Sequence, residues 1–183
     1  MSNTVNREEY LKAVQRIKEQ KPGYIFLVSK RHDCLKWLCD FLSSESSHIS
    51  LLLDNNHFSY LYPVIDKAIS EHKNMDLILK SDTFKKENLE KIAHLGQSLP
   101  IYITDSEIPC LMMFDHCSIL TETEENGFVC CANAHDGGRQ SYQLNQRKKA
   151  FHLLKEHCPR LSKKAICHYQ KGIIQDNTEH ERT

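Results

Sequence analysis

Short apolar runs alternate with segments of helical periodicity over the first hundred residues. Three runs are almost continuously apolar, as strands covered on both faces of a sheet are: 23–29, 48–54 and 75–81. Around them, apolar residues recur at intervals of three and four, which predicts helices over 6–20, 33–42, 58–69 and 84–95. After the N-terminal helix, the repeated strand–helix order predicts a parallel sheet with right-handed crossovers.

The pattern changes after Leu99, where short apolar runs are separated by turn residues instead of helices. These runs predict four more strands, over 100–104, 108–114, 117–121 and 128–133. A last periodic segment predicts a helix over 144–157, ended by Pro159. The expected fold is therefore α/β, with a mixed sheet in which three parallel strands from β-α units are followed by an antiparallel extension, and with helices on both faces.

The 183 residues are enough for one domain with a real core. We expect a single α/β domain over 1–158 and a tail over 159–183 that is basic, then polar and partly disordered. The N-terminus is polar, and no apolar run approaches the ~20 residues that span a bilayer. We therefore expect a cytoplasmic protein whose eight cysteines are reduced thiols. Because no cysteines or histidines have the spacing of a known zinc site, neither a metal nor a cofactor is expected.

The charge is unevenly distributed although its sum is zero. Residues 1–144 carry 15 basic against 20 acidic groups, whereas residues 145–171 carry eight basic groups and only Glu156. One interpretation is a solvated helix face. The other is an anionic partner such as a nucleic acid, bound by the basic residues of this segment. The candidates are Arg147, Lys148, Lys149, Lys155, Lys163 and Lys164.

The segment IPCLMMFDHCSIL follows the strand–helix series and precedes a hairpin and a C-terminal helix. This order, over about residues 5–158, resembles one half of the phospholipase D superfamily, whose strand carries His-x-Lys-x4-Asp with a nucleophilic histidine. Aligned on Asp115, the histidine position is Ile108 and the lysine position is Cys110, and the later Gly-Ser-x-Asn feature is echoed only by Asn133. Since phosphodiester exchange needs a nucleophile and cationic donors, the resemblance implies a non-catalytic relative. It is similar to the degenerate phospholipase D-like domains of bacterial proteins and archaeal sensors.

Polar residues follow the predicted parallel strands, at the edge where α/β proteins usually bind ligands. A cleft there is one interpretation, and capping of helices by Asp33, Asn56 and Asp82 is the other. No glycine-rich phosphate loop follows any of the three strands, which argues against a dinucleotide or P-loop site. The candidate ligand-binding residues, including one from each of two later loops, are Lys30, Arg31, His32, Asp54, Asn55, His57, Asp115 and Arg139.

Three functions stay open at this point. The first is a non-catalytic, phospholipase D-like binding or regulatory domain with no catalytic residues, for which a homodimer is the candidate assembly. The second is a sensor or enzyme that binds a small molecule or nucleotide at the polar strand ends. The third is a nucleic-acid-binding protein that uses the basic C-terminal helix. The missing nucleophile inclines the interpretation away from an enzyme.

Overall fold

A computed structural model describes residues 23–27, 32–115, 117–121, 128–132, 139–162 and 164–165. The predicted helix over 6–20 and most of the predicted tail lie outside these residues. The strands are β1 (Gly23–Leu27), β2 (His48–Leu53), β3 (Asn74–Lys80), β4 (Ile101–Thr104), β5 (Leu111–Met113), β6 (Cys117–Thr121) and β7 (Phe128–Ala132). The helices are α2 (His32–Ser44), α3 (Asn55–Ser70), the short 3-10 helix η1 (Ser81–Thr83), α4 (Lys86–Gly96) and α5 (Arg139–His157).

The seven described strands form one mixed sheet in the order β1-β7-β6-β5-β2-β3-β4. Strands β2, β3 and β4 pair in parallel, as expected for strands joined by helical crossovers. Strands β5, β6 and β7 form an antiparallel meander that joins β2 on one side and β1 on the other. The sheet therefore has a parallel half and an antiparallel half, and β2 stands at the junction between them.

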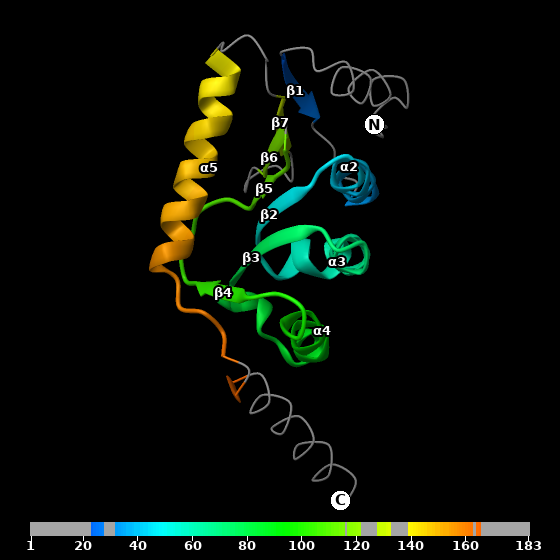
Figure 1. Cartoon of the computed structure of the whole chain (residues 1–183), viewed down its shortest axis with the longest axis vertical. Coiled ribbons are helices and arrows are strands. Elements are labelled where there is room, and N and C mark those ends of the chain that lie inside the picture. The colour runs from blue at the N-terminus through cyan, green and yellow to red at the C-terminus, as the bar shows by residue number, and fades with distance from the viewer. Residues whose placement is uncertain are drawn as a thin grey trace, which may run out of the picture.

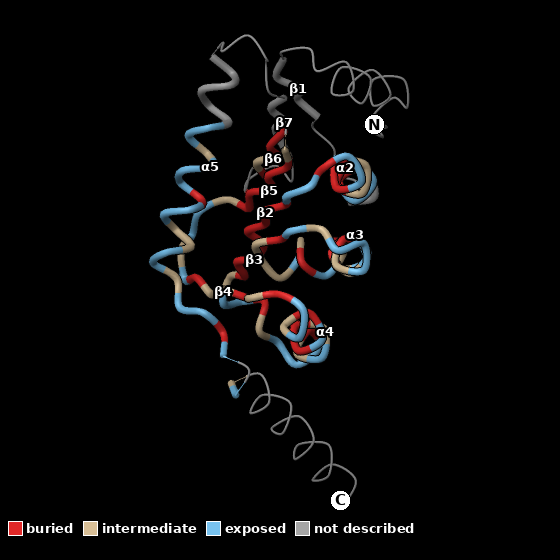
Figure 2. Tube along the Cα trace, viewed as in Figure 1, coloured by how far each residue is buried: buried red, intermediate tan, exposed pale blue. Residues whose placement is uncertain are grey.

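Helices cover both faces of the sheet (Figure 1): α2, α3 and α4 lie on one face and α5 lies on the other. Because successive side chains of a strand point to opposite faces, β2 and β3 serve two cores. Leu51 and Leu53 belong to the larger core with the three helices, whereas Leu52 and Ile78 join a smaller core with Phe151 of α5. Figure 2 shows the buried residues concentrated along the centre of the sheet.

Helix α5 is polar along most of its 19 residues. Its described apolar contacts with the sheet come from Phe151 and Leu154, while Leu153 is 55% exposed. After the helix, the chain runs beside β4, where the Ile103 N–H donates to the carbonyl of Pro159 and the Leu161 N–H donates to Ile101. Neither α5 nor any other helix in the described part is long and apolar enough to cross a membrane.

The predicted fold class is confirmed: the chain is α/β, with a mixed sheet and helices on both faces. Two strands are placed differently from the expectation: the strand over 23–29 is not hydrogen-bonded to the other parallel strands, and the strand over 100–104, expected in the antiparallel extension, joins the parallel block. β1 pairs with β7 in antiparallel fashion and lies at the sheet edge, and β4 completes the hydrogen-bonded parallel block. The same strand–helix order is compatible with both arrangements, so the local pattern could not distinguish them.

Candidate functional site

The residues predicted to bind a ligand fall at opposite ends of the sheet. Asp54, Asn55 and His57 lie together at the carboxyl end of β2. Asp115 follows β5 and lies beside the beginning of β2, where it bonds to Ser47 and lines a pocket at the other end of the sheet from Asp54 and His57. The other four predicted residues lie outside the described part, wholly or in their side chains: Lys30, Arg31, His32 and Arg139.

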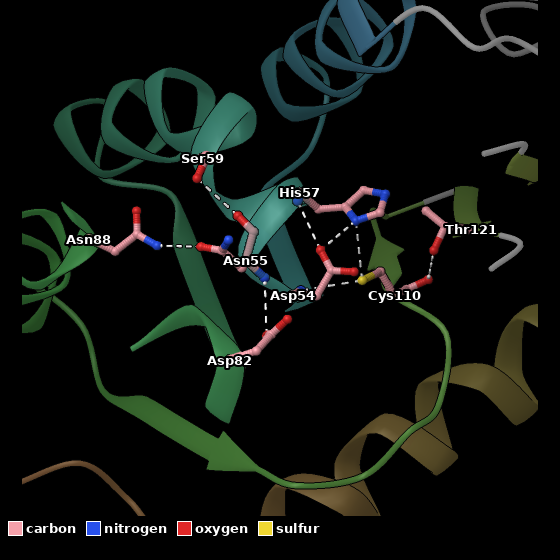
Figure 3. Close-up of polar contacts among 8 residues, drawn as sticks. All are labelled: Asp54, Asn55, His57, Ser59, Asp82, Asn88, Cys110 and Thr121. Carbon is pink, nitrogen blue, oxygen red and sulfur yellow. Dashed lines mark hydrogen bonds and ion pairs between the residues drawn. The ribbon is translucent and has the colours of Figure 1, made fainter. Parts of the chain in front are cut away.

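Asp54 and His57 form a close pair at the start of α3. Asp54 is the N-cap of the helix, and its Oδ1 accepts a hydrogen bond from the His57 backbone N–H at 2.9 Å. The same oxygen lies 2.7 Å from His57 Nδ1 (Figure 3). Aspartate is a favoured N-cap residue, and the three-residue spacing turns the His57 ring back over the cap. The pair therefore follows from the local sequence, in which an N-cap aspartate is followed three residues later by a histidine.

Cys110 completes the cluster from a distant part of the chain. Its Sγ lies 3.5 Å from His57 Nδ1 and accepts a hydrogen bond from the Asp54 N–H at 3.3 Å. The side chain is buried, at 1% exposure. Antiparallel pairing of β5 with β2 carries Cys110 to this position. In the sequence, Cys110 stands out only at the lysine position of the resembled motif, because no local spacing connects it to residues more than fifty positions away.

The electrostatics of the cluster favour an ion pair. Burial by itself would raise the pKa of Asp54, but hydrogen bonds from His57 hold the pKa of this carboxyl well below its usual range. Burial would likewise lower the pKa of His57, yet the hydrogen bond with Asp54 and the contact with Cys110 raise it to about 9. At neutral pH the pair is therefore an imidazolium and a carboxylate, each stabilising the charge of the other.

The arrangement differs from a catalytic triad. In a triad the two ring nitrogens of histidine serve different partners, one the orienting carboxylate and the other the nucleophile. Here the same nitrogen, Nδ1 of His57, faces both Asp54 and Cys110. This geometry therefore does not provide a cysteine nucleophile that is activated by a histidine as in a catalytic triad.

Further hydrogen bonds tie the start of α3 to the neighbouring elements. The Asn55 N–H donates to Asp82 Oδ1 at 3.2 Å, and its side-chain oxygen accepts from Asn88 Nδ2 at 2.7 Å. Asn88 is buried and also donates to the carbonyl of Thr83. The expected capping by Asn56 and Asp82 is corrected in its positions. Asp54 is the N-cap of α3, and Asp82, which follows β3, accepts the Asn55 N–H in the first turn of that same helix.

Asp115 has a structural role in the loop before β2. Its Oδ2 accepts the backbone N–H and the hydroxyl of Ser47, each at 2.9 Å, and its Oδ1 accepts the N–H of His48 at 3.1 Å. These bonds fasten the turn after β5 to the start of β2. Its partner position in the aligned motif, Ile108, is 39% exposed and carries no titratable group.

A pocket of about 310 Å³ lies between α5 and the end of the sheet at which β2 and β3 begin. Asp76 in this pocket bonds to both Lys155 Nζ, at 2.8 Å, and His48 Nε2, at 3.0 Å. The hydrogen bond with Asp76 raises the pKa of Lys155. Lys148 Nζ reaches a neutral group, the Asp115 carbonyl, at 3.2 Å. The four basic side chains that line the pocket are His48, Lys148, His152 and Lys155.

The predicted anion-binding residues of the basic segment are spread around α5. Arg147 donates to Ser118 Oγ at 2.8 Å, and Lys148 and Lys155 face the pocket. Lys149 and Lys164 are exposed, and Lys163 lies outside the described part. The segment therefore combines cations that attach α5 to the sheet with cations that face water.

Comparison with known proteins gives a fold likeness and no family. No family model matches the chain, and no curated protein matches its sequence. Among solved structures, the chain is similar to TrmBL2, an archaeal chromatin protein described as having a novel mode of DNA binding, with a TM-score of 0.59 and 13% identity. The match covers 85% of this chain and 65% of that one, so this chain spans less than two thirds of its neighbour's length.

The raised pKa of His57 predicts a stability that falls in alkaline solution. A histidine whose folded pKa of about 9 exceeds its ordinary value of 6.5 stabilises the fold fully below pH 6.5 and loses that contribution as the pH rises through 9. The shift corresponds to a contribution on the order of 3 kcal/mol. In urea denaturation, the free energy of unfolding of the wild type should decrease between about pH 6 and about pH 9.5. His57→Gln should remove most of that decrease. The exposed His152 serves as control, and His152→Gln should leave the decrease unchanged; equal pH profiles for wild type and His57→Gln would contradict the ion pair.

Proposed function

We propose that the chain is a non-catalytic, phospholipase D-like binding domain with a regulatory role. The order of the elements supports this kinship. The strand–helix series leads to β5 within IPCLMMFDHCSIL, then to the β6–β7 hairpin and the final helix α5, which is the order on which the resemblance rests.

The observation that carries the absence of catalysis is the state of the three aligned positions. Ile108 offers no nucleophile, and the Cys110 thiol is buried against Asp54 and His57, where it supplies no positive charge to a phosphate. The Asp115 carboxylate accepts hydrogen bonds from two backbone N–H groups and a hydroxyl. Phosphoryl transfer depends on a nucleophile and on cationic donors, so these residues do not support it.

A binding role is supported by the pocket under α5. Its volume of about 310 Å³ falls in the range of small-molecule sites. Lys155 forms an ion pair with Asp76, whereas the Lys148 ammonium donates to the carbonyl of Asp115. The lining combines two lysines and two histidines with two aspartates, and Lys148 is the cation that would pair with a small anion such as a phosphate ester or a carboxylate.

Nucleic-acid binding is a second candidate function. The fold neighbour is described as a DNA-binding chromatin protein, and the segment over 145–171 is strongly basic. Exposed cations that do not attach α5 to the sheet would contact the phosphates; in the described part they include Lys149, Arg160 and Lys164. Such contacts are independent of base sequence. They weaken as the salt concentration rises, because the release of counterions on binding is then less favourable.

The catalytic prediction concerns phosphodiester hydrolysis. The purified chain should hydrolyse bis(p-nitrophenyl) phosphate no faster than buffer, and Asp115→Asn should give the same rate, because the aligned positions contain no nucleophile. Initial rates at 405 nm, about the absorption maximum of nitrophenolate, measure this against an authentic phosphodiesterase. Turnover by the wild type that is lost in Asp115→Asn would show an enzyme.

The binding prediction concerns the pocket. Inorganic pyrophosphate should raise the melting temperature of the wild type in a concentration-dependent manner, because a ligand that binds only the folded state stabilises it. Lys148→Ala should abolish this shift while leaving the melting temperature without ligand nearly unchanged, since the Lys148 ammonium gives up only one exposed bond to a carbonyl. Lys86→Ala, on the opposite face of the sheet, is the matched control. A shift that persists in Lys148→Ala places the anion elsewhere and counts against the pocket.

The nucleic-acid prediction concerns Lys149. If α5 contacts phosphates, fluorescence anisotropy with a short duplex should give an affinity that falls steeply with salt, with a slope of about −0.9 for each phosphate contacted. Lys149→Glu should weaken this binding by about tenfold or more, and Lys86→Glu should not, although both change the net charge equally. Binding that is absent, insensitive to salt, or equally weakened by both variants would exclude α5 as the interface.

A further inference from the structure

Three side chains with metal-binding atoms converge at the carboxyl end of β2. Asp54 follows β2, His57 lies in the first turn of α3, and Cys110 precedes β5 (Figure 3). One ligand atom from each lies within 4.8 Å of the others. We propose that this cluster is a binding site for a transition-metal ion of the zinc class. The inference does not depend on the proposed function, which concerns the opposite end of the sheet and α5.

The donor set selects the class of metal. A carboxylate oxygen, an imidazole nitrogen and a thiolate sulfur are the three kinds of atom that zinc accepts in proteins. Calcium and magnesium require oxygen ligands and would leave the sulfur and nitrogen unused. Zinc, cobalt and their neighbours bind such mixed sets. The chemistry of Asp54, His57 and Cys110 therefore favours this class over the alkaline-earth ions.

The distances fit a tetrahedral centre with little movement. With zinc–nitrogen and zinc–sulfur bonds of about 2.05 and 2.3 Å at a tetrahedral angle, the two ligand atoms stand about 3.6 Å apart. Cys110 Sγ and His57 Nδ1 are 3.5 Å apart. The corresponding nitrogen–oxygen separation is about 3.4 Å. Because Asp54 Oδ1 and His57 Nδ1 are now 2.7 Å apart, a small rotation of the carboxylate would admit the ion.

The hydrogen bonding of the sulfur also matches a thiolate ligand. The Asp54 backbone N–H donates to Cys110 Sγ at 3.3 Å, which treats the sulfur as an acceptor. Donors of this kind orient and stabilise metal-bound thiolates. One nitrogen of His57 faces both Asp54 and Cys110, and a single proton there is shared between two acceptors. A metal ion in its place would bond to all three atoms.

The site is closed on the sulfur side and open on the other. Cys110 is 1% exposed, while the side chains of His57 and Asp54 are 19% and 27% exposed. Three protein ligands and one open side are the arrangement of zinc sites that bind a water molecule or an external ligand. The capping of α3 is compatible with this role, because a carboxylate has two oxygens and can accept the His57 N–H while it binds a metal.

Cobalt(II) tests the proposal because its spectrum reports the ligands. Titration of the reduced full-length chain should give a one-to-one complex with d–d bands and a sulfur-to-cobalt charge-transfer band, which zinc then displaces. Cys110→Ser should remove the charge-transfer band, and Cys158→Ser, a change at another described free cysteine, should retain it. Since outer partners of metal ligands alone are worth 10- to 100-fold in affinity, loss of Cys110 should weaken zinc binding by more than about 100-fold.

A second variant separates loss of metal from loss of fold. Asp54→Asn keeps a good N-cap for α3, so its circular dichroism should match the wild type while its zinc affinity falls. The proposal is overturned if no stoichiometric cobalt complex forms, or if the charge-transfer band survives in Cys110→Ser. It is also overturned if folded Asp54→Asn binds zinc as tightly as the wild type.

Discussion

The burial of β2 and β3 on both faces is the constraint from which the rest of the structure follows. Leu51, Leu53 and Leu77 are covered by α2, α3 and α4, while Leu52 and Ile78 are covered by α5. A strand buried on both sides disfavours charged side chains along its middle, because an unpaired charge there is costly. The titratable side chains therefore lie toward the two ends, His48 and Asp76 at one and Lys80 and Asp54 at the other. This explains why the two candidate sites lie at opposite ends of the strands β2 and β3.

The two ends differ in electrostatic character. At the carboxyl end, Asp54 and His57 neutralise each other in a small cluster with the buried thiol of Cys110. At the other end, α5 crosses the sheet with few apolar contacts and is attached partly by polar bonds, from Arg147 to Ser118 and from Lys155 to Asp76. Part of the basic charge seen in the sequence thus serves to hold a polar helix on the sheet. The cations that hold α5 on the sheet are then engaged with Ser118 and Asp76 and are less available to a nucleic-acid phosphate.

Features encoded by local sequence could be predicted, and features that depend on distant strand pairing could not. The apolar runs identify β2 and β3, and the polar residues after β2 identify Asp54 and His57 as a candidate site. The antiparallel partner of β1 is β7, which lies about a hundred residues further along the chain, so no local pattern indicates the pairing. The same is true of Cys110, whose place beside His57 follows from the pairing of β5 with β2. Vicinal and near-neighbour cysteine spacing gave no sign of a metal site because the ligands come from separate elements.

Asp115 shows why a motif position does not by itself define a site. The Asp115 carboxylate stands at the aspartate position of the motif that the sequence resembles, but it lies in the turn after β5, where its oxygens accept backbone N–H groups of Ser47 and His48. The cluster of Asp54, His57 and Cys110 lies instead at the opposite end of β2. His48 and Asp54 are six residues apart on and just beyond β2, a separation of about 20 Å at 3.3 Å per residue. Sites that far apart with no shared partner contribute independently to stability, so ligand binding at the pocket and metal binding at the cluster report on separate parts of the molecule.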